Sequence, residues 1–353
     1  MRPPFEWDAH SDQPKIIIDQ SFKRRARLSA KSDYLKMFAL SGAVLPIAGL
    51  KCPFLRGNVA HEKDIFGIGL SLDKGYQQLE LTDELGVSHI LVRLPLWDTG
   101  RITEYAAFAS EASKRGKSVL INVLQDREHI EDAKLFGVAL TKIFSALGHF
   151  SHEFQIGNAI NRIKWGFFSV SEYLNIFRTA QSIRDERFPN IELLGPSVID
   201  FEYFYTVRAL FGRQDISFDR LSCLLYVDRA GSPYARQLGI FNLAAKIKFL
   251  ASIQSMSTKV KNKGIYITEV NWPIAGTAPY APTSDKECVS IEKYSEHMRD
   301  YFKIAQESGF VSRVYWHQLI APGYGLIDDR GGKIKKTRAF YIFKELTSNR
   351  LKA

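Results

Sequence analysis

The chain has 353 residues, of which 45% are hydrophobic and 24% are charged, a composition typical of a globular protein with a large core. The formal net charge of +10 fits either an ordinary basic surface or an anionic partner such as an acidic glycan or a lipid headgroup. The sequence has no zinc-ligand spacing and no RNA-binding signature, and its cysteines (Cys52, Cys223 and Cys288) are too widely spaced for a disulfide framework or a metal cluster, so we expect neither a nucleic-acid partner nor a metal.

The N-terminal region changes from polar to apolar. Residues 1–32 are polar and basic and contain the run Lys23-Arg24-Arg25-Ala26-Arg27, whereas residues 37–50 are almost wholly apolar. The apolar run is shorter than the roughly 20 residues that span a bilayer, but a basic region followed by such a run is also typical of a secretory signal. We therefore expect residues 1–60 to form an extension. Three alternatives remain: a helix that plugs the bottom of a barrel, a segment for export or membrane association through residues 23–50, and a disordered leader. A periplasmic or inner-membrane location is favoured over a cytoplasmic one.

Strand-like and helix-like segments alternate from residue 65 onward. The expected strands are residues 66–70, 89–94, 118–124, 153–158, 191–196, 220–226, 264–269 and 312–317. The expected helices are residues 76–85, 102–114, 128–147, 171–188, 203–211, 239–257, 291–308 and 337–346. Strands that alternate with helices indicate a parallel sheet covered by helices, and eight such units predict an α/β fold of the (β/α)₈ TIM barrel type. We expect the barrel at residues 61–346 and a C-terminal tail at residues 347–353.

The segment Ile267-Thr268-Glu269-Val270-Asn271-Trp272-Pro273 carries the strongest functional signal. Its β-branched start predicts a buried strand, and Glu269 stands where that strand ends. Active sites of TIM barrels lie at the carboxyl ends of the strands, and glycosidases carry a carboxylate nucleophile there. Lys263 precedes the strand, so it is not a candidate for a Schiff-base lysine.

The other strand ends supply polar and aromatic side chains together. The candidate substrate-binding residues are Arg93, Trp97, Asn158, Asn161, Trp165, Tyr226, Asp228, Trp272, Trp316 and His317. Sugars require this mixture, because aromatic faces stack on the ring while amides and carboxylates bond the hydroxyl groups. The histidines are otherwise scattered, so we expect no metal and no cofactor.

An ordered set of short motifs resembles the clan of retaining (β/α)₈ glycosidases with catalytic glutamates on strands four and seven, the cellulase-like and xylosidase-like families. The set consists of Val92-Arg93-Leu94-Pro95, Ile156-Gly157-Asn158, Tyr226, Thr268-Glu269 and Tyr315-Trp316, and the resemblance covers roughly residues 65–345. It implies that Glu269 is the nucleophile, that Arg93 bonds it and keeps it ionised, and that Tyr226 orients it. It also implies that Asn158 bonds the sugar 2-hydroxyl and that Trp316 forms the floor of the subsite.

One position departs from that clan. The residue after the strand-four asparagine is there the glutamate general acid, and here it is Ala159. Retaining hydrolysis needs two carboxyl groups about 5–5.5 Å apart. Glu153 cannot substitute, because it lies near the start of its strand and on the opposite parity from Asn158. Three explanations remain: an engineered substitution, an acid from another loop (Asp200, Glu202 or Asp228), or a phosphate leaving group that needs no acid.

We therefore expect a glycoside hydrolase that acts on a poly- or oligosaccharide, for which a bacterial surface glycan is one candidate, with a carbohydrate partner that can be anionic. The main alternative is a non-catalytic carbohydrate-binding protein on a degenerate barrel. A transglycosidase that uses an activated phosphate donor is a further alternative. A phosphate-handling isomerase or aldolase is disfavoured, because no phosphate loop follows strands seven or eight.

Overall fold

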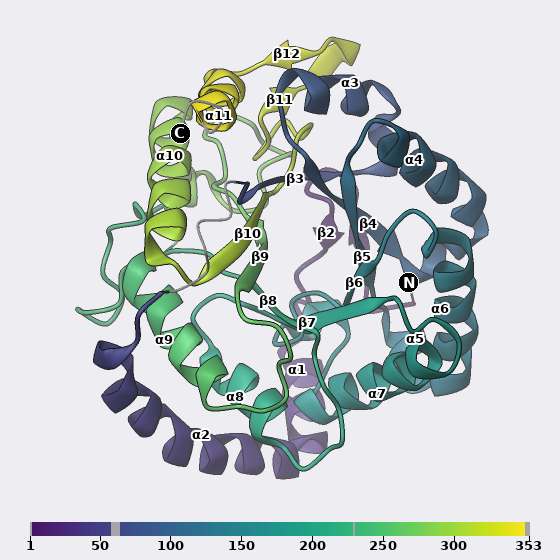
Figure 1. Ribbon diagram of the computed structural model, residues 1–353, viewed down its shortest axis with the longest axis vertical. Coiled ribbons are helices and arrows are strands. Elements are labelled where there is room, and N and C mark those ends of the chain that lie inside the picture. Colours follow the sequence, from purple (N-terminus) through teal and green to yellow (C-terminus); the bar gives the residue numbers. More distant parts are fainter. Residues whose placement is uncertain (1, 58–63, 229, 350–353) are drawn as a thin grey trace.

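A computed structural model describes residues 2–57, 64–228 and 230–349, and it contains a closed barrel of eight parallel strands (Figure 1). The barrel strands are β3 (Phe66–Leu70), β4 (His89–Pro95), β5 (Ser118–Leu124), β6 (Glu153–Ile156), β7 (Glu192–Ile199), β8 (Arg220–Leu224), β9 (Ile265–Val270) and β10 (Val311–Trp316). Pairing follows chain order, and β10 closes the barrel against β3. The expected (β/α)₈ barrel is thereby confirmed.

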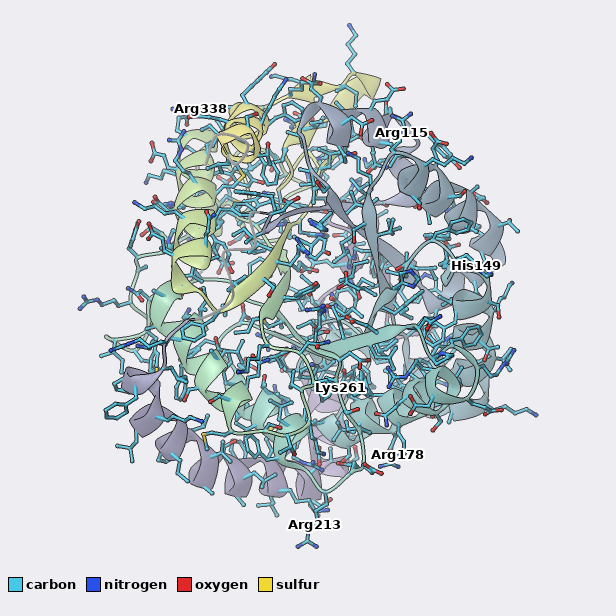
Figure 2. All side chains as sticks on the ribbon, in the orientation of Figure 1. Arg115, His149, Arg178, Arg213, Lys261 and Arg338 are labelled. Carbon is cyan, nitrogen blue, oxygen red and sulfur yellow. The ribbon has the colours of Figure 1, made fainter. Side chains whose placement is uncertain are left out.

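Helices surround the barrel and bury their apolar faces against it. They are α3 (Gln77–Glu84), α4 (Ile102–Lys114), α5 (Arg127–Glu131), α6 (Ala133–Leu147), α7 (Val170–Arg187), α8 (Tyr203–Phe211), α9 (Leu243–Ser255), α10 (Ile291–Ser308) and α11 (Arg338–Asn349). The helix expected at residues 128–147 is in fact two helices, since the Asp132 side chain caps α6 by accepting hydrogen bonds from two backbone amides. Basic side chains such as Arg115, Arg213 and Arg338 lie at the periphery (Figure 2).

Two strands, β6 and β8, end two residues earlier than the sequence predicts. β6 stops at Ile156, because Gly157 and Ala159 both have positive φ angles (82° and 45°), which extended strands do not adopt. β8 stops at Leu224, so Tyr226 lies in the following loop. Both changes place candidate site residues on loops at the mouth of the barrel.

Strand β9 contains one extra residue before its end. The pairing advances by two residues in β10, from Val314 to Trp316, while β9 advances by three, from Ile267 to Val270. An extra residue of this kind is a β-bulge, which redirects a side chain. Ile267 and Val270 both pack into the core between barrel and helices, and Glu269 between them faces the mouth.

The N-terminal residues wrap around the barrel from the mouth to the outside. A short hairpin of β1 (Trp7–Asp8) and β2 (Gln13–Pro14) lies over the mouth, and α1 (Gln20–Ser29) follows. Helix α2 (Lys31–Lys51) then packs along α8 and α9 (Figure 1). The helix is long and apolar enough to cross a membrane. Only 22% of its most apolar segment is buried in the protein, so most of that segment is exposed.

Candidate active site

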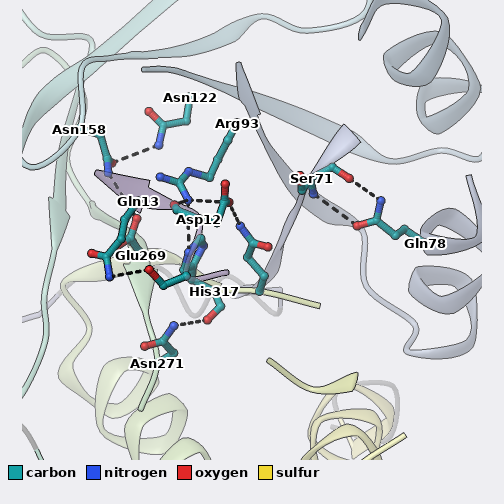
Figure 3. A network of polar contacts seen from close by, with 12 residues as sticks. Asp12, Gln13, Ser71, Gln78, Arg93, Asn122, Asn158, Glu269, Asn271 and His317 are labelled. Carbon is teal, nitrogen blue, oxygen red and sulfur yellow. Dashed lines mark hydrogen bonds and ion pairs between the residues drawn. The ribbon is translucent and has the colours of Figure 1, made fainter. Parts of the chain in front are cut away.

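Glu269 lies at the carboxyl end of β9 and accepts two hydrogen bonds, of which Figure 3 shows the one from Asn158. The Tyr226 hydroxyl donates to Oε1 at 2.9 Å, and the Asn158 amide donates to Oε2 at 3.4 Å. Burial and the adjacent charge of Glu269 raise the pKa of the Tyr226 phenol, so it keeps the proton that it donates. The two donors hold the carboxylate in one orientation at the wall of the cavity.

The side chain of Asn158 is itself held by an amide network. Asn122 and Gln155 donate to its Oδ1 at 3.1 and 3.3 Å, and Gln125 accepts a hydrogen bond from its backbone amide. Because Oδ1 is occupied as an acceptor, the Nδ2 group turns toward Glu269. Asn122, Gln125 and Gln155 were not among the sequence candidates, although each stands on or just after a predicted strand.

Arg93 lies beneath the cavity but bonds Asp12 in place of Glu269. Its Nη1 donates to the Asp12 carbonyl oxygen at 2.7 Å and to the Asp12 carboxylate at 2.8 Å. Burial lowers the pKa of Arg93, but the charges of Asp12 and Glu269 outweigh burial and raise it. The guanidinium therefore remains charged and lies within electrostatic range of both carboxylates.

His317 completes the floor of the site next to Arg93. Its Nε2 lies 3.5 Å from Arg93 Nη1, and its ring stacks on Tyr324 with the two centroids 5.5 Å apart. Burial lowers the pKa of His317 to about 3, and the charge of Arg93 acts in the same direction. The imidazole is thus neutral at physiological pH and cannot serve as a proton donor.

A cavity of about 600 Å³ opens above these residues, a size within the usual range for small-ligand sites. It is lined by Ser11, Asp12, Gln13, Ile16, Arg93, Arg162, Lys164, Trp165, Ile199, Asp200, Tyr226, Val227, Glu269, Asn271, Pro273, Pro282, Thr283, Ser284, Glu287, His317 and Tyr324. Polar groups and an aromatic ring thus meet in one hollow at the carboxyl ends of the strands.

The three candidate acids occupy different positions. Asp200 lines the cavity and is paired with Arg162, and burial raises its pKa although Arg162 acts in the opposite direction. Glu202 bonds Arg162 and Asn161 outside the cavity lining. Asp228 is exposed and also lies outside the lining. Asp200 alone of the three therefore faces the cavity.

Ala159 does not face the cavity. It is fully buried in a small apolar cluster with Leu124, Trp165 and Leu224, and its φ angle is 45°.

The predicted aromatic residues separate into two groups. Trp165 lines the cavity, and Trp97 lies near it at the end of β4. Trp272 and Trp316 instead lie in the core, where their rings stack 5.9 Å apart beneath α10. Their hydrogen bonds go to the Gly231 carbonyl and the Tyr294 hydroxyl.

Several polar residues of the cavity lining were also missed from the sequence, among them Asp12 and Lys164. Asp12 comes from the N-terminal hairpin, and Lys164 follows the end of β6. Burial lowers the pKa of Lys164 to about 8, although Glu269 acts in the opposite direction, and its Nζ donates to Gln13 at 2.6 Å. No local pattern in the sequence indicates that the hairpin docks on the barrel.

Within the described ranges, no cluster of three or more His, Cys, Asp or Glu side chains is arranged to hold a metal ion. His149, one of the scattered histidines, lies exposed at the periphery (Figure 2).

No protein-family model matches the sequence, and no curated protein matches it. Solved structures do match in shape. Virulence factor SghA from Agrobacterium tumefaciens is 9% identical, with a TM-score of 0.58 over 85% of this chain and 99% of that chain. A GH39 enzyme from Xanthomonas axonopodis pv. citri is 12% identical, with a TM-score of 0.59 over 83% of this chain and 67% of that chain.

A GH128 endo-β-1,3-glucanase from Amycolatopsis mediterranei is 11% identical, with a TM-score of 0.52 over 79% of this chain and 98% of that chain. At such identities the similarity concerns the fold. The chain therefore has the (β/α)₈ barrel fold found in these solved structures, two of which are a GH39 enzyme and a GH128 glucanase, as the sequence predicted.

Proposed function

We propose that this protein is a glycoside hydrolase that cleaves a poly- or oligosaccharide, with Glu269 as its nucleophile. The observation that carries the proposal is the pair of donors, Tyr226 and Asn158, that holds the Glu269 carboxylate at the wall of the cavity. The similar structures support a carbohydrate ligand, because SghA was solved with its substrate analog salicin and the GH128 glucanase with laminarihexaose.

In this proposal, Glu269 attacks the anomeric carbon and forms a covalent glycosyl-enzyme, which water then hydrolyses. Retention of configuration follows from the two successive displacements. Arg93 stabilises the ionised carboxylate through space, and Tyr226 and Asn158 orient it.

The proton for the departing oxygen is assigned to Asp200. Its carboxyl group lines the same cavity as Glu269, and its raised pKa increases the protonated fraction that a general acid needs. Asp200 gives its proton to the leaving oxygen in the first step and takes one from the attacking water in the second. Arg162, which holds Asp200, would orient it in both steps.

A second candidate is a transglycosidase that uses a glycosyl phosphate donor. Lys164 favours it, because this cation lines the cavity and its one hydrogen bond to another described residue goes to the neutral side chain of Gln13. A phosphate group leaves without protonation, so this reaction would not require Asp200. If the protein is a hydrolase, Asp200→Asn should abolish turnover. If it is a transglycosidase with a phosphate donor, Lys164→Met should abolish turnover.

The decisive experiment uses activated 2-deoxy-2-fluoro glycosides of a panel of sugars, which trap a glycosyl-enzyme. We expect intact mass to show one adduct and peptide mapping to assign it to Glu269, with none in Glu269→Gln. Asp200→Asn is the matched control, because a dinitrophenyl leaving group needs no acid and labelling should persist. Glycan binding without an adduct for any sugar would identify a non-catalytic carbohydrate-binding protein.

A further inference from the structure

The N-terminal hairpin, residues 6–15, forms part of the candidate active site although it lies more than 70 residues before Arg93 in the sequence. Ser11 and Asp12 of its turn and Gln13 of β2 line the cavity. Each of the last two accepts a hydrogen bond from a side chain of the barrel mouth, Arg93 or Lys164. The hairpin is therefore bound to the mouth by specific polar contacts.

Asp12 is held by two donors and still faces the cavity. Its Oδ2 accepts from Arg93 at 2.8 Å and from Gln318 at 2.6 Å, while 26% of its side chain remains exposed. A carboxylate has about four acceptor positions, so positions remain for hydroxyl groups of a ligand. The backbone of Asp12 is in the left-handed region (φ 49°), which non-glycine residues seldom adopt. The surrounding contacts hold it there.

Trp7 covers the aromatic residues on one side of the mouth. Its ring meets Trp97 edge-on at 5.3 Å and Trp165 at 5.9 Å, and the Arg93 guanidinium lies 5.7 Å from its centre. Trp7 and Arg93 thus occupy part of the aromatic surface on this side of the mouth. On that side the cavity ends at the hairpin.

We propose that the hairpin is a wall of the substrate site, that Asp12 binds hydroxyls of a terminal sugar, and that the site accepts the end of a saccharide chain. This proposal rests on the proposed function of Glu269. It deepens that function by assigning exo-action to a barrel whose cleft the hairpin closes at one end. Without the hairpin, a chain could continue past Arg93 toward Trp97.

The test compares two dinitrophenyl 2-fluoro glycosides on the full-length protein. One carries the reactive sugar alone, and the other carries one more sugar on its non-reducing side. We expect the single-sugar probe to label Glu269 at least about 10-fold faster, and Trp7→Ala to bring the two rates close together. Ile18→Ala, at an exposed position beyond the hairpin, is the matched control and should keep the wild-type ratio.

Asp12→Asn adds a separate measurement. Loss of a charge-assisted hydrogen bond should slow labelling by the single-sugar probe about 10-fold, with little change in the order of the two probes. Equal or faster labelling of wild type by the extended probe would contradict the proposal that the hairpin closes one end of the site. Failure of every probe to label the wild type or any variant would contradict the proposal that Glu269 is the nucleophile. The proposal about the hairpin, which rests on it, would then fall as well.

A second, independent observation concerns helix α2, which is apolar on both sides. One side, with Met37, Val44 and Ala48, is buried against α8 and α9. The other side is exposed and carries Leu35, Phe38, Ile47 and Leu50, the last of which is 76% exposed. Residues 37–50 contain no charged residue. A helix that is apolar all round is normally covered on all sides.

Specific polar contacts at both ends of α2 hold the helix in place along the barrel. Asp33, buried in α2, pairs with Arg208 of α8 at 2.7 Å and accepts from the Ser171 hydroxyl at 2.6 Å. At the other end, the Ser252 hydroxyl donates to the Ala48 carbonyl at 2.7 Å. A helix fixed in this way can lie on a surface but cannot cross a bilayer.

We propose that the exposed face of α2 lies on the surface of an anionic lipid bilayer. Charge complementarity selects this partner, because exposed Arg24, Arg25, Arg27 and Lys31 precede the apolar face. Amphipathic surfaces with flanking cations bind anionic lipid headgroups, because each cation near the membrane adds electrostatic attraction. A dimer formed through the exposed face of α2 would instead bring the cations of both copies close together, where they would repel one another.

Flotation of the full-length protein with vesicles tests this surface. We expect binding to phosphatidylglycerol-containing vesicles, weaker binding to pure phosphatidylcholine, and a further loss at high salt. The double variant Ile47→Glu, Leu50→Glu should bind at least about 10-fold less, whereas Leu238→Glu, an exposed loop position, should bind like wild type. No binding to vesicles of any composition, or a dimer in solution that the double variant dissociates, would overturn the proposal.

Discussion

At the residue scale, the two carboxylates of the site, Glu269 and Asp12, differ in the groups that are bonded to them. Glu269 is contacted by two neutral donors, Tyr226 and Asn158, whereas Asp12 takes up the neighbouring guanidinium of Arg93. Two neutral donors leave lone pairs on the Glu269 oxygens and add no full positive charge that would make the carboxylate a weaker nucleophile. This difference in bonding partners supports the proposal that Glu269 attacks the substrate while Asp12 only binds it.

Tyr226→Phe tests the orientation of Glu269. Removal of one donor that is fixed next to the reacting group typically costs about 100-fold in rate, so labelling by a 2-fluoro glycoside should slow by that order. Stopped-flow release of dinitrophenol measures the rate, and circular dichroism checks the fold. Tyr341→Phe, at an exposed tyrosine, should label at the wild-type rate. An unchanged rate in Tyr226→Phe would mean that Asn158 alone positions the carboxylate.

His317 should make the protein less stable in acid. Its pKa is about 3 in the folded state against an ordinary value of about 6.5, so between these values only the unfolded chain takes up a proton. The free energy of unfolding should therefore fall as the pH drops from 6.5 to 3, by up to about 1.4 kcal/mol per pH unit.

His317→Asn removes this proton uptake. Urea unfolding at several pH values should show a shallower fall for His317→Asn than for wild type over that range. His149→Asn, at an exposed histidine, should follow the wild-type curve. Parallel curves for wild type and His317→Asn would show that the imidazole is protonated in the folded protein.

At the element scale, the sequence predicts the strands and helices of the barrel. It does not predict the exact strand register or the contacts by which the N-terminal hairpin docks on the mouth. The strands of the barrel follow from their apolar runs, and Glu269 was found because its strand ends in a β-branched segment. The bulge in β9 was not predictable, because it depends on a register with β10 that only tertiary packing sets. The hairpin was missed for the same reason: residues 9–12 form its turn, and its partners Arg93 and Gln318 are distant in sequence.

The loop after β6 gives a prediction for Ala159. A glutamate there would combine a positive φ angle with burial of a charge among Leu124, Trp165 and Leu224. Ala159→Glu should therefore lower the free energy of unfolding by about 3 kcal/mol or more and should not increase turnover. Ala159→Gly is the matched control, because glycine tolerates this φ angle, and it should change stability by less than about 1 kcal/mol.

Turnover of an unactivated glycoside decides the outcome for Ala159. If Ala159→Glu folded stably and gained activity, the loop would have repacked to deliver the carboxylate into the cavity. The general acid would then have been lost by a single substitution in this chain.

At the scale of the whole molecule, the barrel closes where the last units meet the first. β10 pairs with β3, and the Thr347 hydroxyl of α11 donates to the Leu85 carbonyl at the end of α3. Lys336 and Lys344 both reach Glu84 of α3. Residues more than 240 positions apart thus stabilise one junction, and we expect the barrel to unfold as a unit.

Phe343 lies at the centre of this junction. It is fully buried in α11, and its ring meets Phe302 of α10 at 5.3 Å and Phe66 of β3 at 6.1 Å. Phe343→Ala should leave a cavity and cost about 3–5 kcal/mol of unfolding free energy. Tyr341→Ala in the same helix is the control, because that side chain is 57% exposed and should change stability by about 0.5 kcal/mol at most.

Two signals separate a local effect from a global one. Far-ultraviolet circular dichroism follows all helices, whereas tryptophan fluorescence follows Trp165 near the mouth and Trp316 in the core. Because closure couples α11 to β3 and β10, Phe343→Ala should shift the urea midpoint of both signals equally, with an unchanged slope. A separate early transition seen by circular dichroism alone would mean that α11 detaches while the barrel stays closed, and that the C-terminal junction does not stabilise the site.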